Sequence, residues 1–247
     1  MRNQDIFLDT CVILRRTFYV DESGRIKDFL EKRNKKTSTY VCMELNRTFL
    51  ADAETLRTYL YEETSLCEVE ERIAELDDSL NVKDRLKLLL RKITEEPANL
   101  QRAKTILETL IQNYHFILLR DVAVVPSKTE CEQGQYMPGY NCRGVRSMCR
   151  VGNIVEKNIA LFEAVRRNLV ENLRGNQRVF RICLVLDEII KNPEKAREDP
   201  RNCFDIGDIL IALDVPDDFT LVSADRHFFL ICKTLKVPFH FLDPCHY

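Results

Sequence analysis

The sequence predicts an α/β fold with a central parallel sheet and a large, mainly helical insertion. Strand-like apolar runs alternate with helical patterns near both ends of the chain, and this alternation is typical of parallel α/β sheets. The middle of the chain carries helical periodicity instead. We therefore assign residues 1–60 and 200–247 to one α/β core and residues 61–199 to an insertion on it.

Two strands are predicted in the N-terminal part of the core. Residues 5–9 form a short apolar run that ends at Asp9, which places Asp9 at the carboxyl end of a buried strand. Residues 37–42 are rich in Thr, Tyr and Val, which favours a second strand. Glu44 follows directly and begins a long helical pattern. Both acids thus come just after predicted strands.

The predicted insertion is helical on both sides of a loop. Residues 56–114 repeat apolar side chains at helical spacing, and residues 116–125 are strand-like. Residues 126–152 carry four of the seven glycines and three cysteines, so we expect an irregular loop there. Helical patterns resume over residues 154–190, and residues 191–202 form a polar connector.

The C-terminal part of the core has the most regular pattern. A helix starts near Asp208, residues 219–223 form a strand, and Asp225 follows that strand by two residues. Residues 226–235 then predict a helix, and residues 238–242 predict a last strand.

The net charge of -2 gives no overall signal for a nucleic-acid partner, but the charge is uneven. Residues 143–181 contain nine basic residues and three acidic ones. The basic side chains that we assign to nucleic-acid binding are Arg143, Arg146, Arg150, Arg166 and Arg167. A solvated helix face explains the same charge pattern equally well.

Other classes of protein are excluded by what the sequence lacks. It shows no signal peptide and no run of apolar residues that could span a membrane, so we expect a cytoplasmic protein. Most of the ten cysteines lie in apolar runs, which indicates reduced core thiols. Phosphate-binding glycine loops and the common hydrolase motifs are also absent.

Four acids can converge on one edge of the predicted sheet: Asp9, Glu44, Asp208 and Asp225. In a parallel α/β sheet, binding sites lie outside the carboxyl ends of the strands. Gathered carboxylates repel one another, and Mg²⁺ or Mn²⁺, which prefer oxygen ligands, relieve that repulsion. Such ions support hydrolysis of phosphodiesters. For Asp208 and Asp205, each taken alone, a helix N-cap is at least as good an explanation.

The segments around these acids resemble the PIN-domain family, in particular the VapC-like toxin ribonucleases. The matching segments are Ile6–Thr10, Glu44–Leu45, Asp208–Ala212 and Leu221–Phe228. The resemblance implies a Rossmann-like α/β/α sandwich. It also implies an endoribonuclease that depends on Mg²⁺ or Mn²⁺ and acts on RNA.

The resemblance further implies roles for single residues. The four acids would bind the metal, and Ser223 would orient them by hydrogen bonding, with Thr10 and Asp205 as further supporting residues. An inhibitory protein partner, as in toxin–antitoxin pairs, and a homodimer are compatible with such a family.

A second candidate metal site lies in the predicted loop. Cys131, Cys142 and Cys149 could bind a structural Zn²⁺, with a fourth ligand from His115, Cys183 or Cys203. The alternative, which the spacing favours, is a loop packed with unliganded thiols.

Two other functions stay open at this point. The first is a DNA nuclease of the same fold, because a carboxylate cluster serves either backbone. The second is a non-catalytic module that binds nucleic acid or protein, with the acidic residues 62–78 and the cysteine loop facing a partner. His227 lies close to Asp225 in sequence and could approach the site, but a helix-surface histidine is the preferred interpretation.

Overall fold

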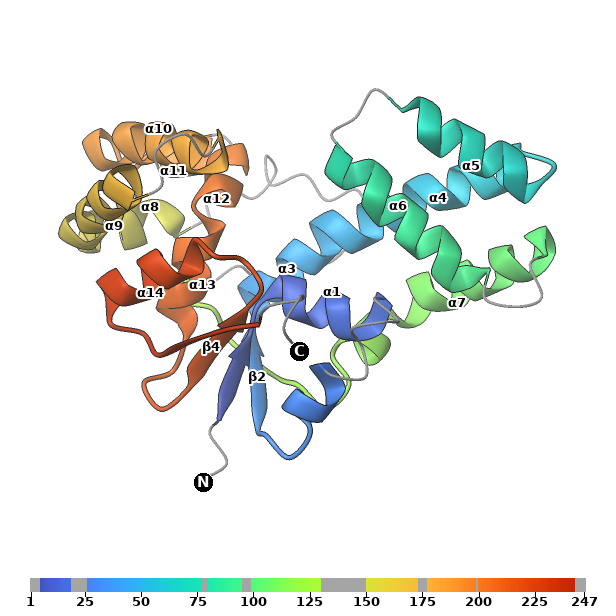
Figure 1. Cartoon of the computed structure of the whole chain (residues 1–247). Coiled ribbons are helices and arrows are strands. Elements are labelled where there is room, and N and C mark those ends of the chain that lie inside the picture. Colours follow the sequence, from blue (N-terminus) through green and yellow to red (C-terminus); the bar gives the residue numbers. More distant parts are fainter. Residues whose placement is uncertain are drawn as a thin grey trace.

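Five short strands form one parallel sheet in the middle of the structure, a computed structural model of the chain (Figure 1). The strands are β1 (Ile6–Leu8), β2 (Lys35–Ser38), β3 (Ala123–Val125), β4 (Thr220–Ser223) and β5 (Phe239–Phe241), in the order β3-β2-β1-β4-β5. The residues that the structure describes are 5–18, 26–76, 80–94, 99–129, 150–172, 177–198 and 200–242. The predicted α/β class with a central parallel sheet is confirmed.

Strand β1 is the central strand, and the later strands lie on both sides of it. β2 pairs with one edge of β1 and β4 pairs with the other. β3 continues the sheet beyond β2, and β5 continues it beyond β4. In open parallel sheets, ligands bind where the strand order changes direction, beyond the carboxyl ends of the strands. Here that place lies between β1 and β4.

Strand β2 is shorter at its carboxyl end than the sequence predicts. The side chain of Ser38 accepts a hydrogen bond from the backbone N–H of Val41 and caps helix α3 (Thr39–Leu45). The prediction of a strand over residues 37–42 is therefore wrong beyond Ser38, because the cap outweighs the strand preference of the residues that follow. Glu44 lies in the second turn of α3 rather than at the start of a helix.

A π-helical turn, η1 (Asn46–Leu50), follows α3 directly and leads into the next helix. The hydroxyl of Thr48 donates to the carbonyl oxygen of Glu44 at 2.7 Å. Single π-helical turns are rare and are often found at functional sites. This one begins two residues after a predicted metal ligand.

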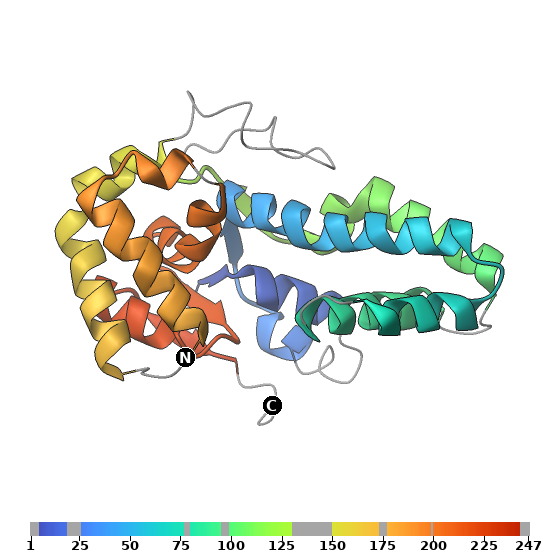
Figure 2. The same ribbon diagram turned by 90° about the horizontal axis from the view of Figure 1, so that it is seen from above.

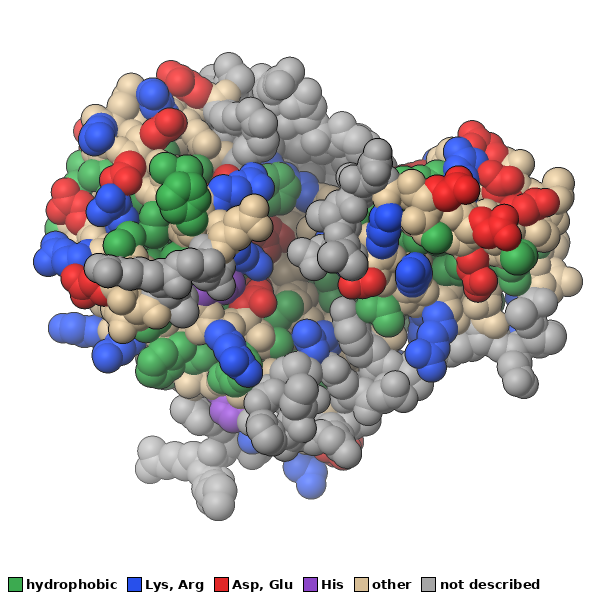
Figure 3. All heavy atoms as spheres, turned by 45° about the horizontal axis from the view of Figure 1, so that its top comes forward, with side chains coloured by type: hydrophobic (Ala, Val, Ile, Leu, Met, Phe, Trp, Pro, Cys, Tyr) green, Lys and Arg blue, Asp and Glu red, His purple; other side chains and the backbone are tan. Residues whose placement is uncertain are grey.

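Four helices between β2 and β3 form an arm that extends away from the sheet (Figure 2). They are α4 (Ala51–Glu62), α5 (Leu66–Glu75), α6 (Leu80–Ile93) and α7 (Leu100–Leu118), and α4 packs on the other three. Acidic side chains gather at the outer end of the arm (Figure 3). Helix α7 continues through Leu118, which belongs to its buried face, so the predicted strand 116–125 is reduced to β3. One strand of the sheet thus comes from the range 61–199.

The helices that follow β3 form a second group on the other side of the sheet (Figure 1). They are α8 (Val151–Lys157), α9 (Ile159–Asn172), α10 (Gln177–Lys191), α11 (Lys195–Glu198), α12 (Pro200–Asp205), α13 (Gly207–Asp214) and α14 (Phe228–Leu235). α9 packs on α10 and on α14, which ties this group to the C-terminal strands. The predicted connector 191–202 is wrong, because α11 and part of α12 occupy it.

The core lies on both faces of the sheet. Phe7, Leu8, Leu221 and Val222 on the two central strands are fully buried. Parallel sheets covered on both faces have apolar strands without polar alternation, as these strands do. Helix α1 (Thr10–Phe18) follows β1 and packs against α3, α6 and α7. None of the described helices is long and apolar enough to cross a membrane.

The cap of α3 gives a stability prediction. Ser38→Ala should lower the free energy of unfolding by about 1 kcal/mol, because the N-cap hydrogen bond is lost. Ser65→Ala is the matched control in the arm, where Ser65 caps α5 in a capping box. Urea unfolding should show a loss of similar size in both variants. An unchanged midpoint for Ser38→Ala would contradict the role of the cap.

Candidate metal centre

Asp9 lies directly after β1, and its carboxylate is held by three donors. The backbone N–H of Thr10 donates to Oδ1 at 2.6 Å. The hydroxyl of Ser223 and the thiol of Cys11 donate to Oδ2 at 2.8 and 2.9 Å. Asp9 is only 3% exposed. Three donors at a buried carboxylate fix its orientation at the carboxyl end of the central strand.

Asp225 lies beside Asp9, beyond the end of β4. Its backbone N–H donates to Oγ of Ser223 at 3.1 Å, so Ser223 links the two acids. One ligand atom from each of Asp9, Cys11 and Asp225 lies within 4.8 Å of the other two. The two acids that the sequence places at strand ends are therefore close enough to share a cation.

Glu44 approaches from α3 and is held by the residue that follows Asp9. The hydroxyl of Thr10 donates to Glu44 Oε2 at 2.6 Å. On its other side, a Cβ at Gly207 would lie 2.7 Å from Glu44 Oε1 and 2.9 Å from the Tyr40 hydroxyl oxygen. Real Cβ atoms do not come so close, so a side chain at this position would require Glu44 or Tyr40 to shift. The sequence analysis gave Gly207 no role, since this approach joins segments far apart in the chain.

Asp208 is the second residue of α13, and Ile206 is the N-cap of that helix. The N-cap explanation of Asp208 is therefore wrong. Its Oδ2 lies 2.5 Å from Nε2 of His227 and 3.0 Å from Nη2 of Arg178. Nη1 of Arg178 also lies 3.7 Å from Oδ2 of Asp225. One arginine on α10 thus bridges two of the four predicted ligands.

His227 is not the helix-surface residue that the sequence suggested. It is 9% exposed and lies at the N-cap of α14, beyond a turn that follows Asp225. That turn brings the imidazole against Asp208, 19 residues earlier in the chain. Burial lowers the pKa of His227. The hydrogen bond to Asp208 and the charge of that carboxylate raise the pKa by more than burial lowers it, so the net shift is upward.

The acids respond differently to their surroundings. Burial, together with the charges of Asp225 and Asp208, raises the pKa of Asp9 to about 6. Burial, together with the charges of Asp9 and Asp208, raises the pKa of Glu44 to about 8. Burial also acts on Asp208, yet hydrogen bonding to His227 and the charge of Arg178 leave its pKa below the ordinary value. Burial is the largest cause of the two upward shifts, and repulsion from the neighbouring carboxylates adds to it.

Cys11 contributes a donor rather than a soft ligand. Burial and the charges of Asp9 and Asp225 raise the pKa of its thiol well above the ordinary value. A protonated thiol donates to Asp9, and metal binding needs the thiolate. The other candidate ligands are carboxylate oxygens, the type of ligand that Mg²⁺ and Mn²⁺ prefer. Cys11 stands where a small polar residue is common in the PIN-like pattern, and its thiol acts as a polar donor to Asp9.

The other predicted supporting and binding residues lie away from these contacts. Asp205 ends α12 and pairs with Arg181 at 3.3 Å. Arg166 on α9 pairs with Asp187 of α10 at 2.6 Å, so its guanidinium links two helices. Arg167 and Arg150 are exposed. Among the basic residues of this stretch that the structure describes, Arg178 is the one whose contacts reach the acids, which a charge count could not reveal.

The possible zinc site cannot be placed on the described part of the chain. Cys131, Cys142 and Cys149 lie outside the described residues, as do Arg143 and Arg146. The three suggested fourth ligands are described, and they lie on different helices. They are His115 on α7, Cys183 on α10 and Cys203 on α12.

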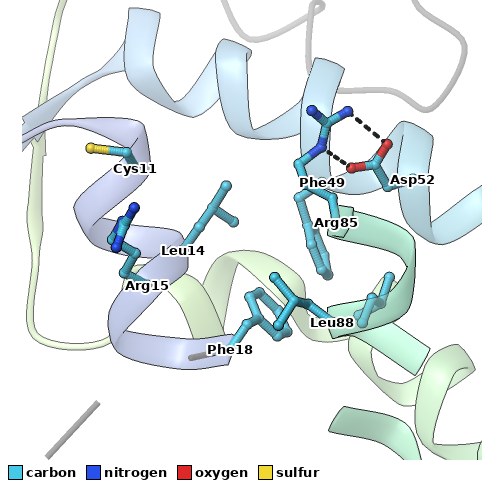
Figure 4. A pocket seen from close by; sticks show the side chains of 9 residues that line it. Cys11, Leu14, Arg15, Phe18, Phe49, Asp52, Arg85 and Leu88 are labelled. Carbon is cyan, nitrogen blue, oxygen red and sulfur yellow. Dashed lines mark hydrogen bonds and ion pairs between the residues drawn. The ribbon is translucent and has the colours of Figure 1, made fainter. Parts of the chain in front are cut away.

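An apolar pocket lies next to the centre, with a volume of about 190 Å³. It is formed between α1, the η1–α4 region and α6 (Figure 4). Leu14, Phe18 and Phe49 line it, and the ion pair of Arg85 with Asp52 closes one side. Its other lining residues are Cys11, Arg15, Leu88 and Leu89. Cys11 is shared with the centre, so the pocket adjoins the donors of Asp9.

The two helical groups flank the centre, and basic, acidic and histidine side chains lie close together on the face between them (Figure 3). Comparisons with models of known protein families, with curated proteins and with solved structures found no match. The functional assignment therefore depends on the residues of the centre and on their geometry.

The raised pKa values predict how the stability of the metal-free protein depends on pH. Between pH 6 and 8 the unfolded chain has an ionised Glu44, with a pKa near 4.5, while the folded chain keeps it protonated up to about pH 8. The free energy of unfolding should therefore fall as pH rises, by up to about 1.4 kcal/mol per pH unit. His227, whose pKa is also raised, adds a fall in the same direction.

Urea unfolding with a chelator at pH 6, 7 and 8 measures this slope. Glu44→Gln should show a clearly smaller slope, because the titrating carboxyl is gone. Glu75→Gln, an exposed glutamate on α5, is the matched control and should keep the full slope. Stability that rises from pH 6 to 8 in the unaltered protein would contradict the prediction.

The close approach at Gly207 gives a second prediction for this site. In Gly207→Ala the methyl group would displace the flexible Glu44 carboxyl more easily than the buried Tyr40 ring, whose hydroxyl donates to the Cys203 carbonyl at 2.7 Å. The fold should persist while Mn²⁺ affinity falls, as measured by calorimetry. Gly152→Ala is the control for Mn²⁺ affinity, because a Cβ at Gly152 would meet the backbone of Pro193 and none of the four acids. Unchanged Mn²⁺ binding in Gly207→Ala would count against Glu44 as a ligand.

Proposed function

We propose that this chain is a divalent-cation-dependent endoribonuclease with a Rossmann-like fold of the PIN type. The observation that carries the proposal is the pair of acids Asp9 and Asp225 at the ends of the two strands where the sheet order changes direction. Asp208 lies near enough to raise the pKa values of Asp9 and Glu44, and Asp9 also raises that of Glu44. Such a cluster is typical of metal-assisted phosphodiester hydrolysis.

The donor set fits Mg²⁺ or Mn²⁺. Asp9 and Asp225 would hold the cation, with Glu44 and Asp208 completing the negative site. When bound, the cation supplies Lewis acidity, which lowers the pKa of water and offsets the charge of a phosphate. The carboxylates around Asp9 and Glu44 add to the effect of burial on their pKa values, and a bound cation would offset that repulsion.

The neighbouring residues prepare these acids for their role. Ser223 and Thr10 hold Asp9 and Glu44 in fixed orientations, as partners of metal ligands commonly do. His227 keeps Asp208 ionised and in place. Glu44, with a pKa of about 8, holds a proton at neutral pH that it must release before it can bind a cation. Cation affinity therefore rises with pH over this range.

RNA is proposed as the substrate because of the resemblance of the four acidic segments to the PIN-domain ribonucleases. The carboxylates themselves contact a phosphodiester in the same way in RNA and DNA. A matched pair of single-stranded RNA and DNA oligonucleotides therefore distinguishes the two nucleases. Cleavage of DNA alone would exclude the ribonuclease.

The proposal predicts loss of activity in two single variants. Asp9→Asn and Asp225→Asn should each reduce Mn²⁺-dependent cleavage by at least about 100-fold, as expected when a ligand is removed from a metal site. Asp84→Asn, an exposed aspartate on α6, is the matched control and should cleave normally. Circular dichroism checks that each variant is folded. Normal cleavage by both folded site variants would refute the active-site assignment.

A further inference from the structure

Arg178 stands out because one side chain faces the whole acidic cluster. Its two terminal nitrogens lie 3.0 Å from Asp208 and 3.7 Å from Asp225. The charges of Asp208 and Asp225, and then those of Asp9 and Glu44, raise its pKa against the effect of burial. The guanidinium therefore already does, in part, what a bound cation would do.

The position of Arg178 in its helix supports a role at the acids. It is the second residue of α10, where the positive end of the helix dipole disfavours a cation. Local helix electrostatics therefore do not explain an arginine here. Arg181, three residues later on the same helix, pairs with Asp205 instead. The two arginines thus lie on the same helix but contact different acids.

The exposure of the partners shows which of them can move. The Arg178 side chain is 57% exposed, whereas the Asp208 side chain is 11% exposed. The guanidinium can therefore leave without opening the core, while the carboxylate stays fixed by His227. An arginine remains charged at any pH near neutrality, and its planar fork matches a phosphate.

We propose that Arg178 is the resident cation of the metal-free centre, that it gives up Asp208 and Asp225 when a divalent cation binds, and that it then binds a phosphate of the nucleic acid. The first part of the proposal, on metal binding, rests on Asp208 and Asp225, whose carboxylates cannot contact Arg178 and a divalent cation equally well at the same time. By thermodynamic reciprocity, each cation then weakens binding of the other. The phosphate half rests on the proposed nuclease function.

Calorimetric titration of the full chain with Mn²⁺ tests the metal half without any need for cleavage. Arg178→Gln should bind Mn²⁺ at least about fivefold more tightly than the unaltered protein, the lower end of usual coupling between competing ligands. Arg181→Gln is the matched control and should bind Mn²⁺ as the unaltered protein does. Mn²⁺ binding by folded Arg178→Gln that is unchanged or weaker would overturn the proposal.

Arg178→Lys is a second variant, which keeps the test possible if Arg178→Gln does not fold. Lysine keeps the charge but lacks the fork that spans two carboxylates, so its Mn²⁺ affinity should lie between those of the unaltered protein and Arg178→Gln. The rise in melting temperature caused by Mn²⁺ should follow the same order. A lysine variant that binds Mn²⁺ more weakly than the unaltered protein would also overturn the proposal.

The phosphate half is tested by steady-state cleavage of an RNA oligonucleotide at saturating Mn²⁺. Arg178→Gln should raise KM about tenfold or more, with a smaller effect on kcat, as expected when one charge-assisted phosphate contact is lost. An unchanged KM would overturn this half. If the unaltered protein cleaves neither RNA nor DNA, the proposed function fails, while the Mn²⁺ titration still decides the role of Arg178 as resident cation.

Discussion

Repulsion among buried carboxylates is the constraint on which the centre depends. The fold relieves it in two ways within one cluster. Burial and the neighbouring carboxylates raise the pKa of Asp9 to about 6 and that of Glu44 to about 8, so Glu44 relieves the repulsion by holding a proton at neutral pH. Asp208 keeps its charge because His227 and Arg178 lie against it. A bound divalent cation would take the place of the proton on Glu44 and of the guanidinium of Arg178. Metal binding would therefore be coupled to the loss of that proton and to the release of Arg178.

The topology of the sheet explains why these acids meet. β1 and β4 are adjacent and parallel, so Asp9 and Asp225 leave the same edge of the sheet although more than 200 residues separate them. Ser223 then links the two carboxylates from the last position of β4. The whole middle of the chain lies between these strands in sequence. Most of its helices belong to the two groups that flank the centre (Figure 2).

The sequence predicted best what depends on short segments. An apolar run that ends at an acid marks a strand and its carboxyl end, so Asp9 and Asp225 could be placed. The start of α3 could not, because Tyr40, Val41 and Cys42 favour a strand and the cap by Ser38 decides against them. His227 was misjudged for a different reason. Its burial depends on the turn after β4 and on α13, which no local pattern shows.

Arg178 and Gly207 were missed because their significance is entirely tertiary. Arg178 is one of nine basic residues in its stretch, and only the packing of α10 selects it. Gly207 precedes a predicted ligand, but its need for a missing Cβ comes from Glu44, more than 160 residues earlier. Neither the contacts of Arg178 nor the close approach at Gly207 can be predicted from charge counts or motif spacing. Residues that tune a site are harder to predict than residues that form it, since they need no motif of their own.

Helix α1 connects the centre to the apolar pocket beside it. Its first residue, Thr10, supplies donors to both Asp9 and Glu44, and Cys11 adds a third contact to the cluster. The later turns of the same helix line the pocket through Leu14 and Phe18 (Figure 4). Close-packed interiors transmit strain from one contact to the next. Any change in the packing of the pocket that shifts α1 therefore also shifts the donors that orient Asp9 and Glu44.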